Sequence, residues 1–106
     1  MEREFWVKTT ILPLFERGKS LEVRVRNGFT KRIRVGDVLF INRKIRRKVN
    51  AIRSYSDFPA MLCVENARHI HPDLDRENLL QFMRSLCPTH LEKLGVLVFE
   101  LEPFSN

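Results

Sequence analysis

Strict alternation of apolar and charged residues is the feature that most constrains the fold of this chain. From Ser20 to Arg26 every second residue is leucine or valine, and the residues between them are charged. A period of two predicts a β-strand with one buried face. Related patterns bring the expected number of strands to about six. The other five are Glu4–Thr9, Ile33–Val35, Val38–Asn42, Val49–Tyr55 and Val96–Leu101.

Helices are expected mainly between the last two of these strands. Apolar residues recur there at helical spacing, and capping residues stand where helices would begin. The segments are Asp57–Val64, a helix starting at Asp73 or Asp75 and ending near Leu86, and a turn opening with the capping box Thr89–Glu92. A short helix is also expected before Gly18, and Asn27-Gly28 is typical of a tight hairpin turn.

The length and the short connections limit the architecture. With 106 residues the chain forms one domain, expected over residues 1–106. Most connections are too short for the crossover helices of a parallel α/β fold. The sequence therefore predicts an α+β domain: a small mixed β-barrel of about six strands with flanking short helices.

Basic residues are concentrated in the first half of the chain. Residues 1–53 hold 15 of the 19 Lys and Arg but 5 of the 13 Asp and Glu, a balance of +10, against −4 in residues 54–106. We expect this half to present a positive surface to a polyanion, RNA or DNA first. The candidate nucleic-acid-binding residues are Lys19, Glu22, Arg24, Arg26, Lys31, Arg32, Arg34, Arg43, Lys44, Arg46, Arg47 and Lys48.

Two of these groups have ordinary alternatives. The run Arg43–Lys48 also suits a solvated hairpin tip, where lysines discourage aggregation. Glu22 lies between Lys19 and Arg24, where it would orient both cations toward a ligand or simply form surface ion pairs.

Three aromatic residues are candidates for stacking on bases. They are Trp6, Phe29 and Tyr55. The apolar surroundings of Trp6 favour a position in the core, whereas Phe29 has polar neighbours.

Four blocks of the sequence resemble the ASCH domain, a branch of the PUA-like superfamily. They are Gly18-Lys-Ser-Leu-Glu-Val-Arg, Ile33-Arg-Val-Gly-Asp, Tyr55-Ser-Asp-Phe and Gly95-Val-Leu-Val-Phe-Glu-Leu-Glu-Pro, and the similarity runs from about Trp6 to Pro103. The resemblance implies a small β-barrel with flanking helices and a cleft beside the barrel. It also implies that Lys19, Glu22 and Arg24 gather in that cleft, with a role in RNA binding or RNA-linked regulation.

The same family offers an enzymatic alternative. Some bacterial members are amidohydrolases that deacylate acetylated cytidine nucleosides with a Lys and a Thr of this motif and a later Glu. The resemblance then implies catalytic roles for Lys19 and Glu22, but Glu22 occupies the Thr position, so the hydroxyl is missing. A lysine beside Glu22 is also expected to stay protonated, whereas a lysine base needs a lowered pKa. We therefore expect a binding domain, with a hydrolase of acetylated cytidine or RNA and a protein-interaction module as alternatives.

The remaining chemistry-bearing residues give weaker signals. Cys63 and Cys87 lie in apolar segments and are predicted to be reduced, buried thiols. His69 and His71, with Cys63 or His90, match no standard zinc spacing, so we expect no metal and no cofactor. Neither a membrane span nor a signal peptide is expected. The predicted protein is a cytoplasmic monomer whose partner is RNA, a nucleotide or a nucleoside.

Overall fold

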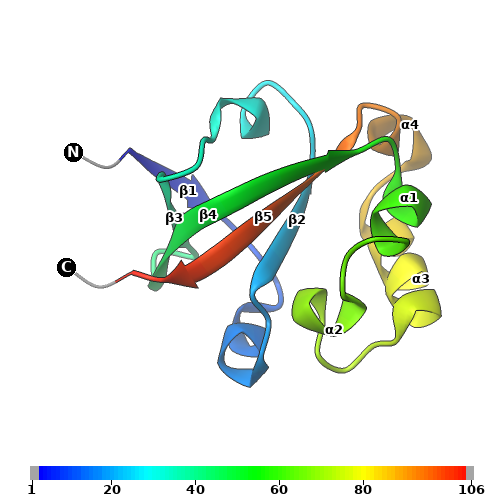
Figure 1. Ribbon diagram of the computed structural model, residues 1–106, viewed down its shortest axis with the longest axis horizontal. Helices are drawn as coiled ribbons and strands as arrows, with labels where there is room; N and C mark the ends of the chain where they lie inside the picture. The colour runs from blue at the N-terminus through cyan, green and yellow to red at the C-terminus, as the bar shows by residue number, and fades with distance from the viewer. Residues whose placement is uncertain (1–2, 105–106) are drawn as a thin grey trace.

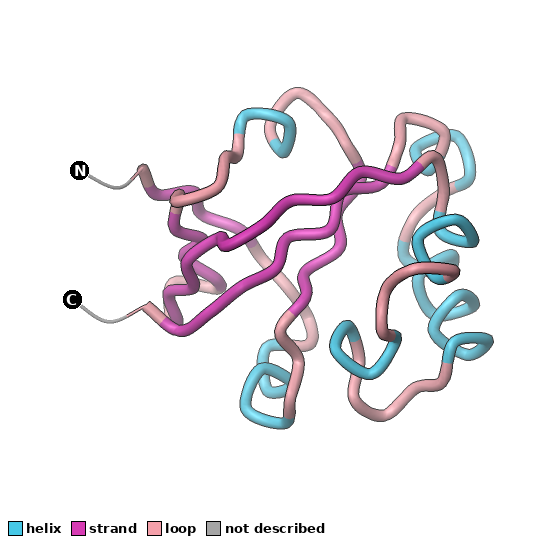
Figure 2. Tube along the Cα trace, viewed as in Figure 1, coloured by secondary structure: helices cyan, strands magenta, loops and turns pink. Residues whose placement is uncertain are grey.

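Five strands of the described residues, 3–104, form one curled mixed sheet in the computed structural model. Their order is β1-β3-β4-β5-β2, so β1 and β2 are the edges of an open half-barrel (Figures 1 and 2). The bounds are β1 Glu4–Val7, β2 Leu21–Val25, β3 Val38–Ile41, β4 Ile45–Tyr55 and β5 Val96–Pro103. Residues 1–2 and 105–106 lie outside the description.

The pairing of the strands explains the curl of the sheet. β1 runs parallel to β3, and the other neighbours are antiparallel. The long strand β4 pairs with β3 near its start and with β5 along its length, and its register shifts between Val49 and Ala51. Such a bulge bends a strand and increases its twist, which lets β4 belong to both halves of the curled sheet.

Short helices fill the connections. The 3-10 helices η1 Leu12–Arg17 and η2 Thr30–Arg32 lie in the first half, and α1 Phe58–Leu62, α2 Ala67–Ile70, α3 Arg76–Leu86 and α4 Thr89–Glu92 lie between β4 and β5. The four α-helices gather at one side of the sheet (Figure 1). The carboxylate of Asp75 accepts from the backbone N–H of Asn78, which settles the predicted start of α3 in favour of Asp75.

Strand β5 lies between two hydrophobic cores. Phe99 is fully buried inside the curl with Leu39 and Val49. On the opposite face of the strand, Val98 packs with Met61 and the other residues beneath the helices. Both faces of β5 are thus covered, which is why its first four residues, Val96–Phe99, are all apolar and buried.

The predicted hairpin at Asn27-Gly28 is wrong. The Asn27 side chain accepts from the backbone N–H groups of Phe29 and Thr30, so the chain enters η2 instead of a new strand. β2 pairs with β5, not with the segment that follows it. Ile33–Val35 is not a strand, although Ile33 is buried, and the expected six strands become five.

Two smaller expectations also need correction. Thr89 does not cap α4; Glu92 is buried and accepts from the backbone N–H of Phe58 at 3.0 Å. Cys63 is exposed and Cys87 is half-buried, although both are unpaired as predicted. Helix α2 was not predicted.

None of the helices described in residues 3–104 has the length and apolar character that crossing a membrane requires.

Candidate functional site

A cleft of about 640 Å³ opens beside edge strand β2. The segment Lys8–Ile11, which leaves the other edge strand, forms one wall, and α3 forms another. Its lining is mostly apolar, and this volume and character are typical of small-molecule sites. The apolar lining residues are Ile11, Val23, Val25, Phe58, Ile70, Leu79, Phe82, Met83, Leu86 and Leu91.

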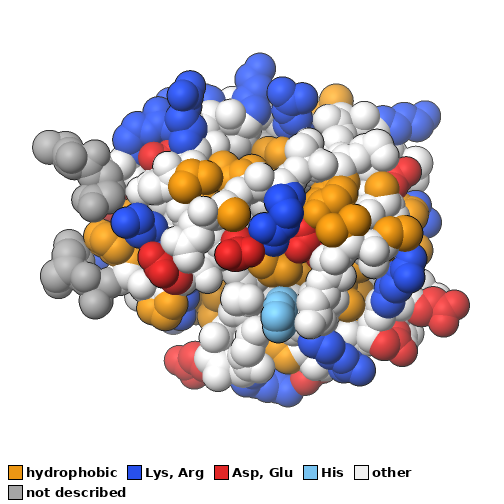
Figure 3. Space-filling view, in the orientation of Figure 1, with side chains coloured by type: hydrophobic (Ala, Val, Ile, Leu, Met, Phe, Trp, Pro, Cys, Tyr) orange, Lys and Arg blue, Asp and Glu red, His pale blue; other side chains and the backbone are white. Residues whose placement is uncertain are grey.

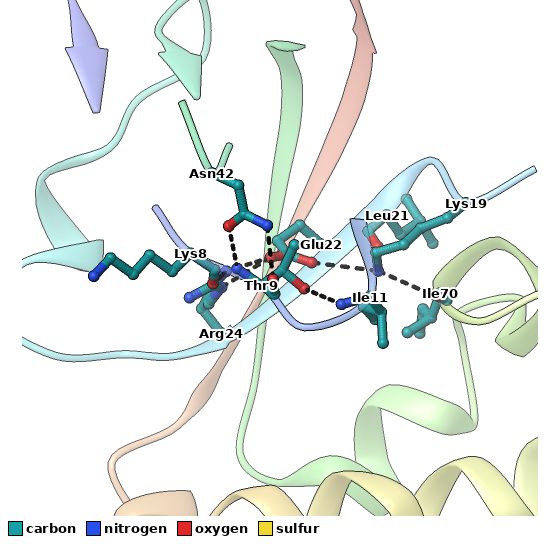
Figure 4. Close-up of polar contacts among 9 residues, drawn as sticks. All are labelled: Lys8, Thr9, Ile11, Lys19, Leu21, Glu22, Arg24, Asn42 and Ile70. Atoms are coloured by element: carbon teal, nitrogen blue, oxygen red, sulfur yellow. Dashed lines mark hydrogen bonds and ion pairs between the residues drawn. The ribbon is translucent and has the colours of Figure 1, made fainter. Parts of the chain in front are cut away.

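Lys19, Glu22 and Arg24 form the charged part of the cleft (Figure 4). Glu22 and Arg24 are two residues apart on β2 and therefore share a face of the strand. One oxygen of Glu22 lies 3.3 Å from the ammonium of Lys19, and the other accepts from Arg24 Nε at 3.0 Å. The exposed fractions of the three side chains are 1%, 5% and 28%, so only the guanidinium retains substantial contact with solvent.

The Lys19 ammonium is surrounded by three acceptors. It donates to the carbonyls of Leu21 at 2.6 Å and Ile70 at 2.8 Å, in addition to its contact with Glu22. Burial lowers the pKa of Lys19, and the charge of Glu22 opposes that shift in part. Three acceptors match the three N–H groups of the charged form, as expected for a protonated lysine. The downward shift in pKa was not predicted, because sequence showed the carboxylate but not the burial.

Hydrogen bonds fix the wall opposite β2. Arg24 Nη2 donates to the carbonyl of Lys8 at 2.6 Å, which bridges the two edges of the half-barrel. Thr9 and Asn42 exchange two hydrogen bonds of 2.8 Å, tying the same wall to the turn between β3 and β4. The rim of the cleft is therefore held in place before any ligand arrives.

His71 is a cleft residue that the sequence did not reveal as one. Its Nδ1 accepts from the backbone N–H of Asp73 at 3.2 Å, which leaves the proton of the neutral ring on Nε2 as a donor. Burial lowers the pKa of His71, with Asp73 opposing the shift. The ring meets Phe82 edge-on, at 5.3 Å between centroids. Among residues 3–104, no group of three His, Cys, Asp or Glu is arranged to hold a metal ion.

The other basic candidates lie outside the cleft. Lys31, Arg32 and Arg34 are exposed in and after η2, where basic side chains gather along the upper edge of Figure 3. Arg26 is exposed just after β2. The run Arg43–Lys48 is not a hairpin tip throughout, because the turn ends at Lys44 and β4 begins at Ile45. Among the basic candidates, Lys19 and Arg24 are the ones that line the cleft.

The three aromatic candidates also differ in position. Trp6 is 56% exposed, so its expected place in the core is wrong; Phe5 and Val7 on either side of it are buried instead. Phe29 is exposed and meets Phe5 edge-on. Tyr55 is half-buried, and its hydroxyl donates to Glu65.

Two solved structures share this fold along almost the whole chain. The crystal structure of hypothetical protein PH0355 has a TM-score of 0.85 and 29% identity, covering 98% of this chain and 100% of that one. The solution NMR structure of protein PF0455 from Pyrococcus furiosus has a TM-score of 0.78 and 31% identity, with both chains fully covered at 100%.

The chain belongs to the family of PF0455. No protein-family model matches it, and no curated protein does. The two structural relatives are described without an activity or a ligand. A functional proposal therefore has to come from the cleft and its chemistry.

Proposed function

We propose that the protein is an ASCH-type, PUA-like domain that binds RNA or a nucleotide in its cleft and acts in RNA-linked regulation. The observation that carries the proposal is the cleft itself, in which a largely apolar wall meets the buried cluster of Lys19, Glu22 and Arg24. The half-barrel with short helices agrees with the fold that the sequence motifs imply.

The two parts of the cleft suit the two parts of a nucleoside. A base has flat apolar faces, which would pack against Phe82 and the aliphatic residues of the wall. Its polar edge needs directed donors, and Arg24 and His71 supply them. Because Glu22 holds Arg24 through two nitrogens, the guanidinium keeps a defined orientation.

Phosphates of a longer ligand would be neutralised outside the cleft. Lys8 is exposed at the rim, and further exposed cations lie beyond it on η2 and on the β3–β4 turn. If about five phosphates of a single strand are neutralised, log affinity falls with log salt at a slope of roughly −3.5. A flat response in binding to a mixed RNA pool would remove the polyanion part of the proposal.

Hydrolysis of a modified nucleoside is the weaker proposal. Burial lowers the pKa of Lys19, which is the direction that a lysine base needs, but the three acceptors around Lys19 Nζ favour the ammonium. We expect no release of acetate from acetylated cytidine. Release that is lost in Lys19→Ala would replace binding by hydrolysis as the function.

An NMR titration tests the binding proposal directly. Amide resonances of the isotope-labelled protein are followed while cytidine, cytidine monophosphate or short RNA is added. We expect shifts on β2, at Lys8–Ile11 and on α3, and none at the Arg53–Glu65 ion pair away from the cleft. A folded protein whose cleft resonances respond to none of these ligands contradicts the proposal and leaves a protein-interaction module.

A further inference from the structure

A second organised surface lies on the outer side of the sheet, apart from the cleft walls. Strand register places Trp6 of β1 beside Phe40 of β3, and Phe40 beside Arg46 of β4. Arg43, in the turn between β3 and β4, lies against the same aromatic group. We call these four residues, with Glu4, the Trp6 face.

The side chains of the Trp6 face hold one another in place. The rings of Trp6 and Phe40 meet edge-on, 6.0 Å apart. The guanidinium of Arg43 lies 4.6 Å from the indole centroid, and that of Arg46 lies 4.0 Å from the ring of Phe40. Glu4 accepts from the indole N–H at 2.9 Å and from Arg46 Nε at 3.2 Å. An exposed tryptophan is thereby fixed in orientation, with the guanidinium of Arg43 over its ring.

The Trp6 face adjoins the cleft through one turn. Asn42 lines the cleft, and Arg43 is the next residue along the chain. Both residues have positive φ angles, 54° and 56°, and Lys44 N–H closes the turn on the carbonyl of Ile41. Lys8, on the cleft rim, is two residues from Trp6 and follows β1 directly.

We propose that single-stranded RNA extends from the cleft onto the Trp6 face, where a base stacks on Trp6 and Arg43 contacts the backbone. This inference rests on the proposed function and refines its ligand to an oligonucleotide rather than a free nucleoside. Aromatic rings beside guanidinium groups are the surfaces on which unpaired bases stack.

The charge of this surface favours a polyanion over a second copy of the chain. Arg43 and Lys44 are exposed, and Arg46 and Lys48 are half-buried on the strand that follows. Glu4 offsets one of these charges through its pair with Arg46, but the balance stays positive, so two such faces brought together would repel each other, whereas a phosphate backbone would be attracted.

Trp6 provides its own reporter, because it is the single tryptophan of the chain. We expect an RNA oligomer of about eight nucleotides to quench Trp6 fluorescence as it binds, since a stacked base contacts the indole. Cytidine monophosphate at saturating concentration should shift the cleft amide resonances while leaving the fluorescence unchanged.

Two variants measure the contribution of the face to affinity. Trp6→Ala should weaken binding of a labelled oligomer by about 5- to 150-fold, the equivalent of one stacked base, without changing mononucleotide binding. Arg43→Gly removes the cation at a position whose φ of 56° suits glycine. This variant should therefore fold as stably as the parent and still bind the oligomer more weakly.

The possible results separate this inference from the proposed function. If the oligomer shifts cleft resonances but neither quenches Trp6 nor loses affinity in Trp6→Ala and Arg43→Gly, the inference is wrong and the cleft proposal stands. If neither the cleft nor Trp6 responds to any nucleotide, both are wrong. A concentration-dependent dimer that buries Trp6 and ignores RNA would identify the face as a self-association surface and overturn the inference.

Discussion

Glu22 and Glu65 are two buried carboxylates with similar first partners and different surroundings. Each side chain is 5% exposed and paired with an arginine, Arg24 at 28% exposure and Arg53 at 34%. Glu65 accepts from two nitrogens of Arg53 and from the hydroxyl of Tyr55. Glu22 has instead a buried ammonium on its other side and a cleft in front of it.

The electrostatics of the two pairs differ accordingly. Hydrogen bonding by Arg53 lowers the pKa of Glu65, and Glu65 in turn raises the pKa of Arg53. That pair is mutually satisfied. In the cleft, burial lowers the pKa of Lys19 despite the nearby carboxylate, so a charge that burial disfavours is kept in the cleft lining. A buried ion pair alone therefore does not indicate a binding site, and it is the pair that faces a cleft and includes a desolvated cation that we propose as one.

The largest expected difference between the two pairs is in stability. Glu22→Gln should lower the free energy of unfolding by about 3–5 kcal/mol, because it leaves Lys19 buried without a counter-charge. Glu65→Gln should cost about 1–3 kcal/mol, since Arg53 can turn toward solvent and keeps Glu100 as a partner. Urea denaturation at neutral pH measures both. An equal or larger loss in Glu65→Gln would contradict the distinction.

A smaller effect is expected at the hydroxyl that belongs to the Glu65 pair. Tyr55→Phe removes the donor to Glu65 and should cost about 1 kcal/mol of stability. Nucleotide affinity should not change, because Tyr55 lies outside the cleft lining. Thermal denaturation and a binding titration on the same sample check the two parts. Weaker nucleotide binding by a fully folded Tyr55→Phe would place the Glu65 pair within the functional site.

The smallest effect concerns the pH dependence contributed by His71. Its pKa in the folded state lies below the ordinary value of 6.5, so the unfolded chain binds the proton more readily. The contribution of His71 to the free energy of unfolding therefore decreases as the pH falls from above 6.5 toward the pKa of the folded state. We expect His71→Gln to flatten the loss of stability between about pH 7 and pH 5, above the range where Asp37 and Glu65 act. An unchanged pH profile would show that the folded state does not disfavour the imidazolium.

Local patterns predicted the elements that depend on local sequence. Alternation predicted β2, and the aspartate cap predicted α3. Because Glu22 and Arg24 are two residues apart, the sequence also placed them on one face of the strand. Alternation in β1 also indicated that Trp6 is exposed. Phe5 and Val7 on either side of Trp6 are buried, so Trp6 lies on the opposite face of the strand. The apolar character of the residue outweighed that signal in the prediction.

Long-range packing was not predictable in the same way. The pairing of β2 with β5 joins segments far apart in the sequence, and it overrode the local hairpin signal at Asn27-Gly28. The cleft is lined by β2, by α3 and by His71 at the end of α2, which are far apart in the sequence, so His71 and Phe82 gave no sign of lining a site. The burial of Lys19 beneath the carbonyl of Ile70 depends on α2, which the sequence did not indicate.

The most direct test of the account compares nucleotide affinity in Arg24→Gln and Arg53→Gln. Each substitution removes a guanidinium from a buried carboxylate, but only Arg24 faces the cleft. Calorimetric titration with the mononucleotide should show a loss of about 10-fold or more in Arg24→Gln and no change in Arg53→Gln, with both variants folded. Equal affinities in the two variants would contradict the assignment of the Lys19–Glu22–Arg24 cluster as the binding site.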